Sequence, residues 1–327
     1  MRPAAIAVAV AAWAGAAATA CLLGACASPP PPPAPATPLS LPARLLAAAP
    51  VFFDDFSYPD VAALPGGGWT VRTAPGHPGV PGARWGDGGL SIQPDPDLPG
   101  NRLLRLSART DGTPGGTQQV QLCHARKVLR GTYAARIRFA DAPRAGADGD
   151  PVIQTFYAVG DLRFPYDPLF SEVDWEYLAN GGWGSPATRL YAISWQTVRV
   201  EPWDAHNSPH EEMRSMAGWH QLTMQVEAPQ VRMFVDGLPV ATHAGRNVPV
   251  APMAIAFNLW FSPAGLLPAG GAPREWDEDV DWVFHAPDRV LAPGEVAAQV
   301  AAWRREGVTR RDTVPVAVPA LPSRCDM

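Results

Sequence analysis

The chain has 327 residues and a mass of 34.8 kDa, which is enough for one large domain or two domains of ordinary size. Hydrophobic residues make up 47% of the sequence and charged residues only 17%, which excludes a wholly disordered polymer. The 26 basic and 31 acidic residues give a net charge of −5, so the composition provides no basic surface for a nucleic acid, and none is expected as a partner.

The amino-terminal segment has the layout of a secretory signal. Arg2 precedes an apolar run that ends in small residues, and the quartet that follows, Leu23-Gly24-Ala25-Cys26, resembles the bacterial lipobox. An uncleaved membrane helix is the alternative, because about 20 apolar residues can also span a bilayer. Such a helix would not need small residues and a cysteine at its end. The sequence therefore predicts a signal peptide over residues 1–25.

Residues 26–50 are expected to connect a lipid anchor to a folded domain. The resemblance to the lipobox implies that Cys26 carries the lipid and that the protein is extracytoplasmic, attached to the bacterial cell envelope only through that lipid. Five consecutive prolines, Pro29 to Pro33, favour an extended polyproline spacer.

The remaining cysteines leave two alternatives open. Cys21 lies in the predicted signal and Cys26 carries the predicted lipid, so Cys123 and Cys325 are the pair that could form a disulfide. An oxidising compartment permits the bond. Two buried thiols are the alternative, because the sequence contains no information on the distance between them.

From Val51 onward the sequence predicts an all-β domain. Short runs rich in β-branched and aromatic residues are separated by clusters of Gly, Pro, Asp and Asn. The predicted strands are Gln119 to His124, Thr132 to Phe139, Val152 to Ala158, Ser171 to Leu178, Arg189 to Trp195, Trp219 to Glu227, Val231 to Val235, Met253 to Phe261 and Val280 to His285. The length of residues 51–285 suits a single sandwich or barrel, and Asp236-Gly237 predicts a tight hairpin.

Residues 286–327 are predicted to hold one helix and a Pro-rich tail. The helix is expected over Pro293 to Val308, where Val296, Val300 and Trp303 recur at helical spacing. The tail beyond it is expected to lie over the domain.

The stretch Ser171 to Leu178 contains an unusual alternation of acidic and apolar residues. Successive side chains of a strand point to opposite faces, so Glu172, Asp174 and Glu176 share one face. Three neighbouring carboxyl groups repel one another and raise at least one pKa, which a sequence selected only for stability would avoid. The pattern favours a functional site, with a calcium-binding or solvated acidic strand as the alternative.

The spacing of the two glutamates suits a specific chemistry. The α-carbons of Glu172 and Glu176 lie roughly 13 Å apart at the usual strand rise, and side chains that lean together narrow this gap. Retaining glycoside hydrolysis uses two carboxyl groups about 5 to 5.5 Å apart. Two inward-leaning glutamates can approach that separation.

Glu172-Val173-Asp174-Trp175-Glu176 resembles the Glu-x-Asp-x-Glu signature of glycoside hydrolase family 16. Six further motifs similar to those of the family follow its order through residues 51–285, and they are Phe53-Asp54-Asp55-Phe56, Gly131 to Arg136, Gly218-Trp219-His220, Val235-Asp236-Gly237, Phe257 to Phe261 and Val280 to Val283. The resemblance implies a concanavalin A-like jelly-roll β-sandwich. It also implies cleavage of a β-linked polysaccharide with retention of configuration.

Each acidic residue of the signature has a role implied by this resemblance. Glu172 corresponds to the nucleophile, Glu176 to the general acid/base, and Asp174 to the carboxylate that tunes the nucleophile. No cofactor is required for this chemistry. Members of the family often hold a structural calcium ion near the last strand, and Asp281 matches an acidic ligand there, although a hydrogen bond at a strand edge is an equal alternative for Asp281.

Aromatic and amide side chains are the candidates for sugar binding. Asn258 and Trp260 share a face opposite Phe257, which predicts that both line the cleft. Asn180 and Trp183 lie in a Gly-rich loop after the acidic strand, where they could contact substrate.

Three other features are assigned to the core or to loops. Trp195 shares a face with Tyr191 and Ile193, which favours the core, and Trp203 is a weaker candidate for the cleft. His210 to Arg214 lacks the second histidine of a zinc-protease helix and is expected in a loop. Glu275 to Asp279 lacks an alternation that would gather its carboxylates, and it is expected as a solvated loop.

The sequence therefore predicts a monomeric, lipid-anchored, endo-acting retaining glycoside hydrolase whose partner is a polysaccharide. A non-catalytic carbohydrate-binding lipoprotein of the same fold is the alternative from a different class. Transglycosylation, in which a sugar replaces water as the acceptor, is a second alternative.

Overall fold

A computed structural model of the chain describes residues 49–323 and residue 325. The predicted signal peptide, Cys26 and almost all of the predicted spacer lie outside the described residues. Within the described part of the chain, no helix combines the length and the apolar character needed to cross a membrane.

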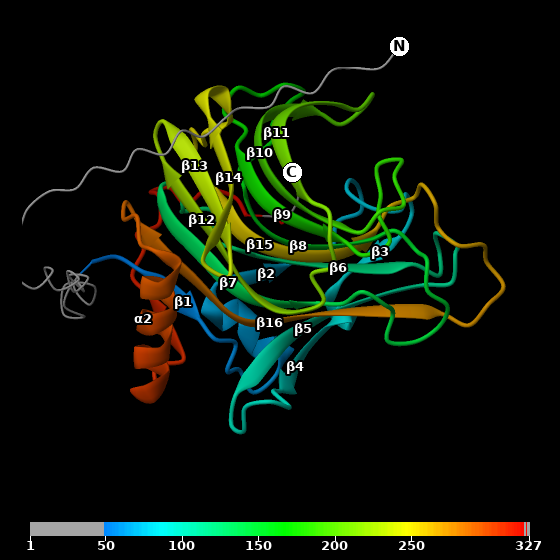
Figure 1. Ribbon diagram of the computed structural model, residues 1–327, viewed down its shortest axis with the longest axis horizontal. Helices are drawn as coiled ribbons and strands as arrows, with labels where there is room; N and C mark the ends of the chain where they lie inside the picture. Colours follow the sequence, from blue (N-terminus) through cyan, green and yellow to red (C-terminus); the bar gives the residue numbers. More distant parts are fainter. Residues whose placement is uncertain (1–48, 324, 326–327) are drawn as a thin grey trace, which may run out of the picture. The chain divides into compact units, whose positions relative to one another are not determined.

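Two largely antiparallel sheets form the body (Figure 1). The first sheet contains, in spatial order, β4 (Leu90–Pro94), β5 (Arg102–Thr110), β16 (Arg274–Pro287), β7 (Gly131–Phe139), β12 (Gly218–Glu227), β13 (Gln230–Val235) and β14 (Leu238–Ala244). The second half of β16 also pairs with β1 (Phe52–Asp54), which in turn pairs with β17 (Arg310–Asp312).

The second sheet contains, in spatial order, β2 (Trp69–Val71), β6 (Gln118–His124), β15 (Ala254–Phe261), β8 (Val152–Val159), β9 (Glu172–Leu178), β10 (Arg189–Arg199) and β11 (Asp204–Glu212). The short strand β3 (Arg84–Trp85) pairs in parallel with β6. Within the described part of the chain, three short 3-10 helices lie in the connections, at Val61–Gly67, Asp87–Gly89 and Gly245–Asn247. Figure 1 shows β9, β10 and β11 bending into a concave surface.

The main hydrophobic core lies between the two sheets. Val173, Trp175 and Tyr177 of β9 are fully buried in it, together with side chains of the first sheet such as Ile137 and Leu222. The period-two alternation of β9 therefore sends its apolar residues into the core and its acidic residues to the opposite, concave face. The all-β sandwich predicted from the sequence is confirmed.

Helix α2 (Pro293–Arg305) covers the other face of the first sheet. Val296, Val300 and Trp303 pack against Phe53 and Phe284 in a second apolar cluster. The helix predicted over Pro293 to Val308 is thus present, and it ends at Arg305.

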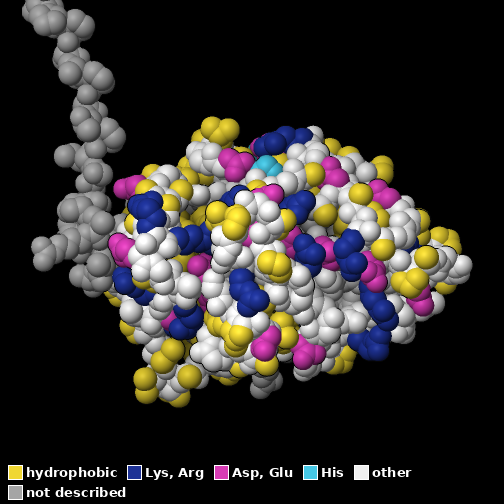
Figure 2. Space-filling view, turned by 90° about the horizontal axis from the view of Figure 1, so that it is seen from below, with side chains coloured by type: hydrophobic (Ala, Val, Ile, Leu, Met, Phe, Trp, Pro, Cys, Tyr) yellow, Lys and Arg dark blue, Asp and Glu magenta, His cyan; other side chains and the backbone are white. Residues whose placement is uncertain are grey.

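Two segments predicted as loops are strands. His210 to Glu212 belongs to β11, which pairs with β10 along its whole length. Glu275 to Asp279 belongs to β16, whose first half lies beside β5. Arginines on neighbouring segments compensate its acidic residues: Arg105 binds Asp279 (2.7 Å) and Arg144 binds Asp277 (2.9 Å). Figure 2 shows side chains of both charge signs interspersed on one face of the molecule.

Glu278 of β16 is a buried acid without an ionic partner among the described residues. Its side chain is 0% exposed and lies on the same face of the strand as the core residues Trp276 and Val280. Burial raises the pKa of Glu278 well above its ordinary value.

We expect Glu278→Met to stabilise the domain more at pH 8 than at pH 4. Because the pKa of Glu278 is raised in the folded state, the unfolding free energy of the wild type falls as the pH rises from the ordinary glutamate pKa toward the raised one. Methionine does not ionise, so the variant does not show this loss. Urea unfolding of both proteins at the two pH values measures the difference. A stability difference that does not change with pH would contradict the expectation.

A disulfide joins the tail to the second sheet. Cys123 of β6 and Cys325 are bonded, with α-carbons 5.4 Å apart and 202 positions between them in sequence. The structure therefore resolves the alternative that the sequence left open. The segment after α2 returns to the concave side of the molecule, where Cys325 is almost fully buried.

Candidate active site

A cleft of about 780 Å³ lies on the concave face of the second sheet. Its floor is built from cross-strand rows, because paired residues on neighbouring strands point to the same face. The central row runs across five strands through Asn258, Thr155, Glu176, Tyr191 and Glu211. The cleft is also lined by loops at the edges of the sheet.

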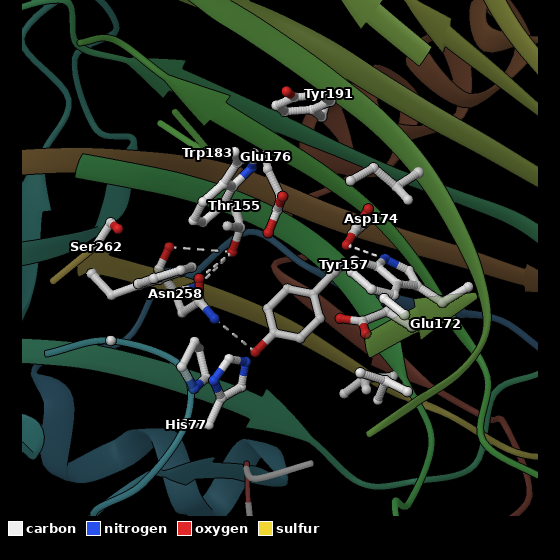
Figure 3. Close-up of a pocket in the computed structure, with 18 of the residues that line it drawn as sticks. His77, Thr155, Tyr157, Glu172, Asp174, Glu176, Trp183, Tyr191, Asn258 and Ser262 are labelled. Atoms are coloured by element: carbon white, nitrogen blue, oxygen red, sulfur yellow. Dashed lines mark hydrogen bonds between the residues drawn. The ribbon is translucent and has the colours of Figure 1, made fainter. Parts of the chain in front are cut away.

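All three acidic residues of β9 line this cleft. Glu172, Asp174 and Glu176 project from one strand toward a space that Tyr157 also enters (Figure 3). Tyr157 of β8 lies directly beside Asp174 in the register. The strand thus carries three carboxyl groups along the floor of one cleft.

Asp174 is the most buried of the three, with 3% of its surface exposed. Trp195 Nε1 donates a hydrogen bond to its Oδ2 at 2.9 Å. Its Oδ1 is buried and has no hydrogen-bond partner among the described residues. One oxygen of Asp174 is therefore available to a proton or to a neighbouring group.

Burial and mutual repulsion oppose the ionisation of the three carboxyl groups. Burial raises the pKa of Glu172 to about 8 and the pKa of Glu176 to about 7, and the charge of Glu176 adds to the rise at Glu172. Burial and the charges of both glutamates raise the pKa of Asp174 well above its ordinary value. The cluster therefore retains protons under conditions in which exposed carboxyl groups have lost theirs.

A network of uncharged side chains supports the floor beside the acids. Thr155 Oγ1 donates to Asn258 Oδ1 (2.6 Å), and Asn258 Nδ2 donates to the Tyr157 hydroxyl oxygen (3.0 Å). Gln121 Nε2 donates to the same hydroxyl oxygen (2.6 Å). Because this oxygen accepts twice, the hydroxyl hydrogen of Tyr157 is free to be donated to an acceptor in the cleft. The sequence analysis did not identify Tyr157. Tyr157 alternates with core residues along β8, and this alternation separates the two faces of the strand without showing which face lines the cleft.

Tryptophans form parts of the cleft wall on both sides of the acids. On the Glu176 side, Trp183 and Trp260 pack with ring centroids 5.8 Å apart. On the Glu172 side, Trp195 meets Trp203 edge-on at 6.0 Å. The carboxyl groups thus lie between two aromatic pairs, an arrangement suited to sugar rings, which present apolar faces between their hydroxyl groups.

The structure places three of the four residues predicted to bind sugar in the cleft. Asn258, Trp183 and Trp260 line the cleft. Asn180 does not, because its amide donates to Asp148 Oδ1 (2.8 Å) and to the carbonyl of Asp150 (3.0 Å), which holds the loop to its neighbour.

The assignment of Trp195 to the core was wrong. Trp195 does share a face with Tyr191 and Ile193, as predicted, but all three line the cleft. Parity groups residues by face, and it cannot tell a concave binding face from a buried one. Trp203, the weaker candidate, also lines the cleft, from the β10–β11 hairpin.

The surroundings of Asp281 do not fit a calcium ion. Arg304 and Arg136 donate to its two carboxyl oxygens at 2.6 and 2.8 Å, and Asn101 donates to one of them at 2.8 Å. Two guanidinium groups neutralise this carboxylate and repel a divalent cation. No group of three or more possible ligands for a metal ion is found among residues 49–323 and 325.

The two tryptophans on the Glu176 side should respond differently to truncation. Trp183 is 49% exposed, whereas Trp260 is 6% exposed and packs against Ile153 and Leu178. We expect Trp183→Ala to weaken the binding of a glycan in the cleft with little change in thermal stability. Trp260→Ala should weaken this binding and also cost about 3 kcal/mol in unfolding free energy. Binding measurements and thermal melting distinguish the two effects, and equal losses of stability would contradict this assignment.

Comparisons with known proteins support the fold. No protein-family model matches the sequence, and no curated protein matches it.

Among solved structures, the β-glucanase of Bacillus licheniformis superimposes with a TM-score of 0.50 at 16% identity, over 73% of this chain and 99% of that chain. A glycoside hydrolase family 16 endo-glucanase from Bacteroides ovatus, solved with a bound ligand, gives 0.53 at 16% identity, over 71% and 98%. The catalytic domain of a laminarinase from Thermotoga petrophila gives 0.51 at 14% identity, over 73% and 98%. The chain thus has the jelly-roll β-sandwich fold of the family 16 glucanases.

Proposed function

We propose that the protein is a retaining, endo-acting glycoside hydrolase that cleaves a β-linked polysaccharide. The observation that carries this proposal is the row of three carboxyl groups on β9, which lies on the floor of a cleft lined by tryptophans. The similar solved structures support a glycosidase at the level of the fold, and one of them is an endo-glucanase in complex with a ligand.

The proposed reaction has two steps. A carboxylate oxygen of Glu172 bonds to the anomeric carbon while the bond from that carbon to the leaving oxygen breaks, and Glu176 transfers its proton to the leaving oxygen. Glu176, now ionised, then removes a proton from water, whose oxygen displaces Glu172 from the anomeric carbon. Each step inverts the configuration at the anomeric carbon, so the two steps together retain it.

These roles require a negative charge on Glu172 and a proton on Glu176. In the free cleft the pKa values of both glutamates are raised, so the mechanism needs a group that stabilises the charged form of Glu172. Asp174 suits this role, because its pKa is raised and its Oδ1 has no other partner among the described residues. A proton on that oxygen can be donated to Glu172 as a hydrogen bond, which lowers the pKa of Glu172.

A non-catalytic carbohydrate-binding protein is the second candidate. It would use the same tryptophans, but it has no need of three buried carboxyl groups that repel one another. Transglycosylation would proceed through the same glycosyl intermediate, with a sugar hydroxyl in place of water.

Hydrolysis of a panel of soluble β-glucans, β-galactans and bacterial wall polymers by the purified protein tests the proposal. We expect new reducing ends from at least one polymer, and proton NMR during the reaction should show the β-anomer first. A first-formed α-anomer would contradict the retaining mechanism. Binding to glycans without any cleavage would favour the carbohydrate-binding alternative.

We also propose that the protein acts at the bacterial cell envelope, anchored by a lipid on Cys26. The support is the lipobox-like quartet before Cys26 and the apolar run that precedes it. Mass spectrometry of the protein from a bacterial host should find an acylated Cys26 as the amino terminus, and Cys26→Ser should release or misprocess the protein. An unmodified terminus elsewhere would contradict the anchor.

A further inference from the structure

The two edges of the second sheet are connected by an aromatic contact over the cleft. In spatial order β2 and β11 are the opposite edge strands of this sheet. His77 belongs to the loop after β2, and Trp203 belongs to the hairpin between β10 and β11. Their rings stack with centroids 5.1 Å apart and an interplanar angle of 30°. We call this pair the rim contact.

Both residues of the rim contact line the cleft that contains the acids. Figure 3 shows His77 among the residues that line the cleft, drawn in this view next to the hydroxyl end of Tyr157. Trp203 meets Trp195, whose indole hydrogen-bonds to Asp174. Two rings in stacking contact leave no room for a sugar ring between them. The rim contact therefore closes a passage above the Glu172 side of the cleft.

The wall next to the rim contact is fixed in place. An apolar cluster extends across the sheet beyond Glu172, from the Cys123–Cys325 disulfide to side chains of β10 and β11, and its members include Tyr157, Val159, Phe170, Val198 and Ala254. These side chains are buried. A long glycan therefore cannot make room on this side by displacing the wall.

The rings of the rim contact are exposed, in contrast to the wall. Trp203 is 53% exposed, and His77 is exposed as well. The base of the His77 loop is held by Arg72, which donates to the carbonyl oxygens of Ala74 (2.9 Å) and His77 (3.0 Å). The ring of His77 and the hairpin indole are thus less buried than the wall beside them.

We propose that His77 and Trp203 are specificity-determining residues that restrict the entry of interior segments of a polysaccharide. This inference rests on the proposed function. A short oligosaccharide or a chain end can enter the cleft beneath a closed rim contact. An interior segment continues on both sides of the cleavage point, so the rings must separate before it can enter, and side branches hinder it further.

Removal of the two rings should change substrate preference rather than overall activity. The comparison uses a β-glucan that the wild type hydrolyses and the aryl β-glycoside of its disaccharide. For His77→Ala/Trp203→Ala, we expect the ratio of kcat/KM on the polymer to kcat/KM on the aryl glycoside to rise about threefold or more. Trp203→Phe, which keeps a ring, should retain the wild-type ratio. Leu238→Ala, at an exposed position in the β13–β14 hairpin, is the matched control for loss of an exposed apolar side chain.

An unchanged ratio in the double variant would overturn this inference while leaving the proposed function intact. An equal fall of both constants would overturn it as well, because it would show that the rings only bind sugar. Absence of hydrolysis by the wild type on every β-linked substrate would instead overturn the proposed function, and this inference with it. Thermal melting of each variant establishes that the domain is folded.

Discussion

Glu172→Gln and Glu176→Gln are each expected to reduce hydrolysis of a natural substrate by on the order of 10³-fold. Glu172→Gln removes the proposed nucleophile, and Glu176→Gln removes the proposed proton donor to the leaving oxygen. Each substitution nearly preserves the shape of the side chain and removes one of three carboxyl groups that repel one another. Both variants should therefore unfold at the same temperature as the wild type or at a higher one.

Chemical rescue should separate the two roles. An aryl glycoside with an activated leaving group needs no protonation, so Glu176→Gln should still form the glycosyl intermediate with it. Azide can then displace Glu172 from the anomeric carbon and give a β-glycosyl azide. In Glu172→Gln, azide can only attack the substrate directly, which gives the α-glycosyl azide. The configuration of each product is read by proton NMR.

Asn180→Gln is a suitable control for these two variants, because Asn180 lies in the loop after β9 and does not line the cleft. It should hydrolyse the substrate at close to the wild-type rate. Wild-type turnover by either glutamine variant would disprove the roles assigned here. Identical azide products from both variants would show that the nucleophile and the acid had not been distinguished.

Loss of the Cys123–Cys325 disulfide is expected to lower the unfolding free energy by about 2–5 kcal/mol. The bond joins positions 202 apart in sequence, so it removes many conformations from the unfolded chain. For a domain of this size, the loss corresponds to a fall in Tm of roughly 4–20 °C. Cys123→Ser and Cys325→Ser should show similar losses, because either substitution removes the same bond.

The double variant provides the control for this prediction. Cys123→Ser/Cys325→Ser should be no less stable than either single variant, since the bond is already absent in both. A reducing agent should lower the Tm of the wild type and leave the Tm of the double variant unchanged. A wild-type Tm that does not respond to reduction would contradict a stabilising role for the bond.

The sequence by itself determined the local geometry of the candidate site. The period of a strand is two, so the spacing of Glu172, Asp174 and Glu176 placed them on one face whatever the rest of the chain does. The same argument placed Asn258 and Trp260 together on one face, which the structure shows to line the cleft. The order of motifs along residues 51–285 predicted the jelly-roll sandwich that the structure shows.

Other predictions failed where neighbouring strands decide the outcome. Glu275 to Asp279 was predicted as a loop because its charges suggested solvent, yet arginines from the adjacent β5 and from a nearby loop compensate those charges in β16. Only the position of β16 beside β5 and the nearby loop shows that these arginines are close enough to compensate its acidic residues. β11 was missed for a similar reason, because its pairing with β10 is not visible in its own polar sequence.

Only the tertiary structure decided which face of each strand is the cleft and what closes it. Trp195 was assigned to the core because parity groups residues without showing whether their face meets another sheet or solvent. The distance between Cys123 and Cys325 and the stack of His77 on Trp203 depend on chain segments far apart in sequence. Local alternation follows from backbone geometry over a few residues, whereas such contacts depend on how the whole sheet bends and on where its loops and tail return.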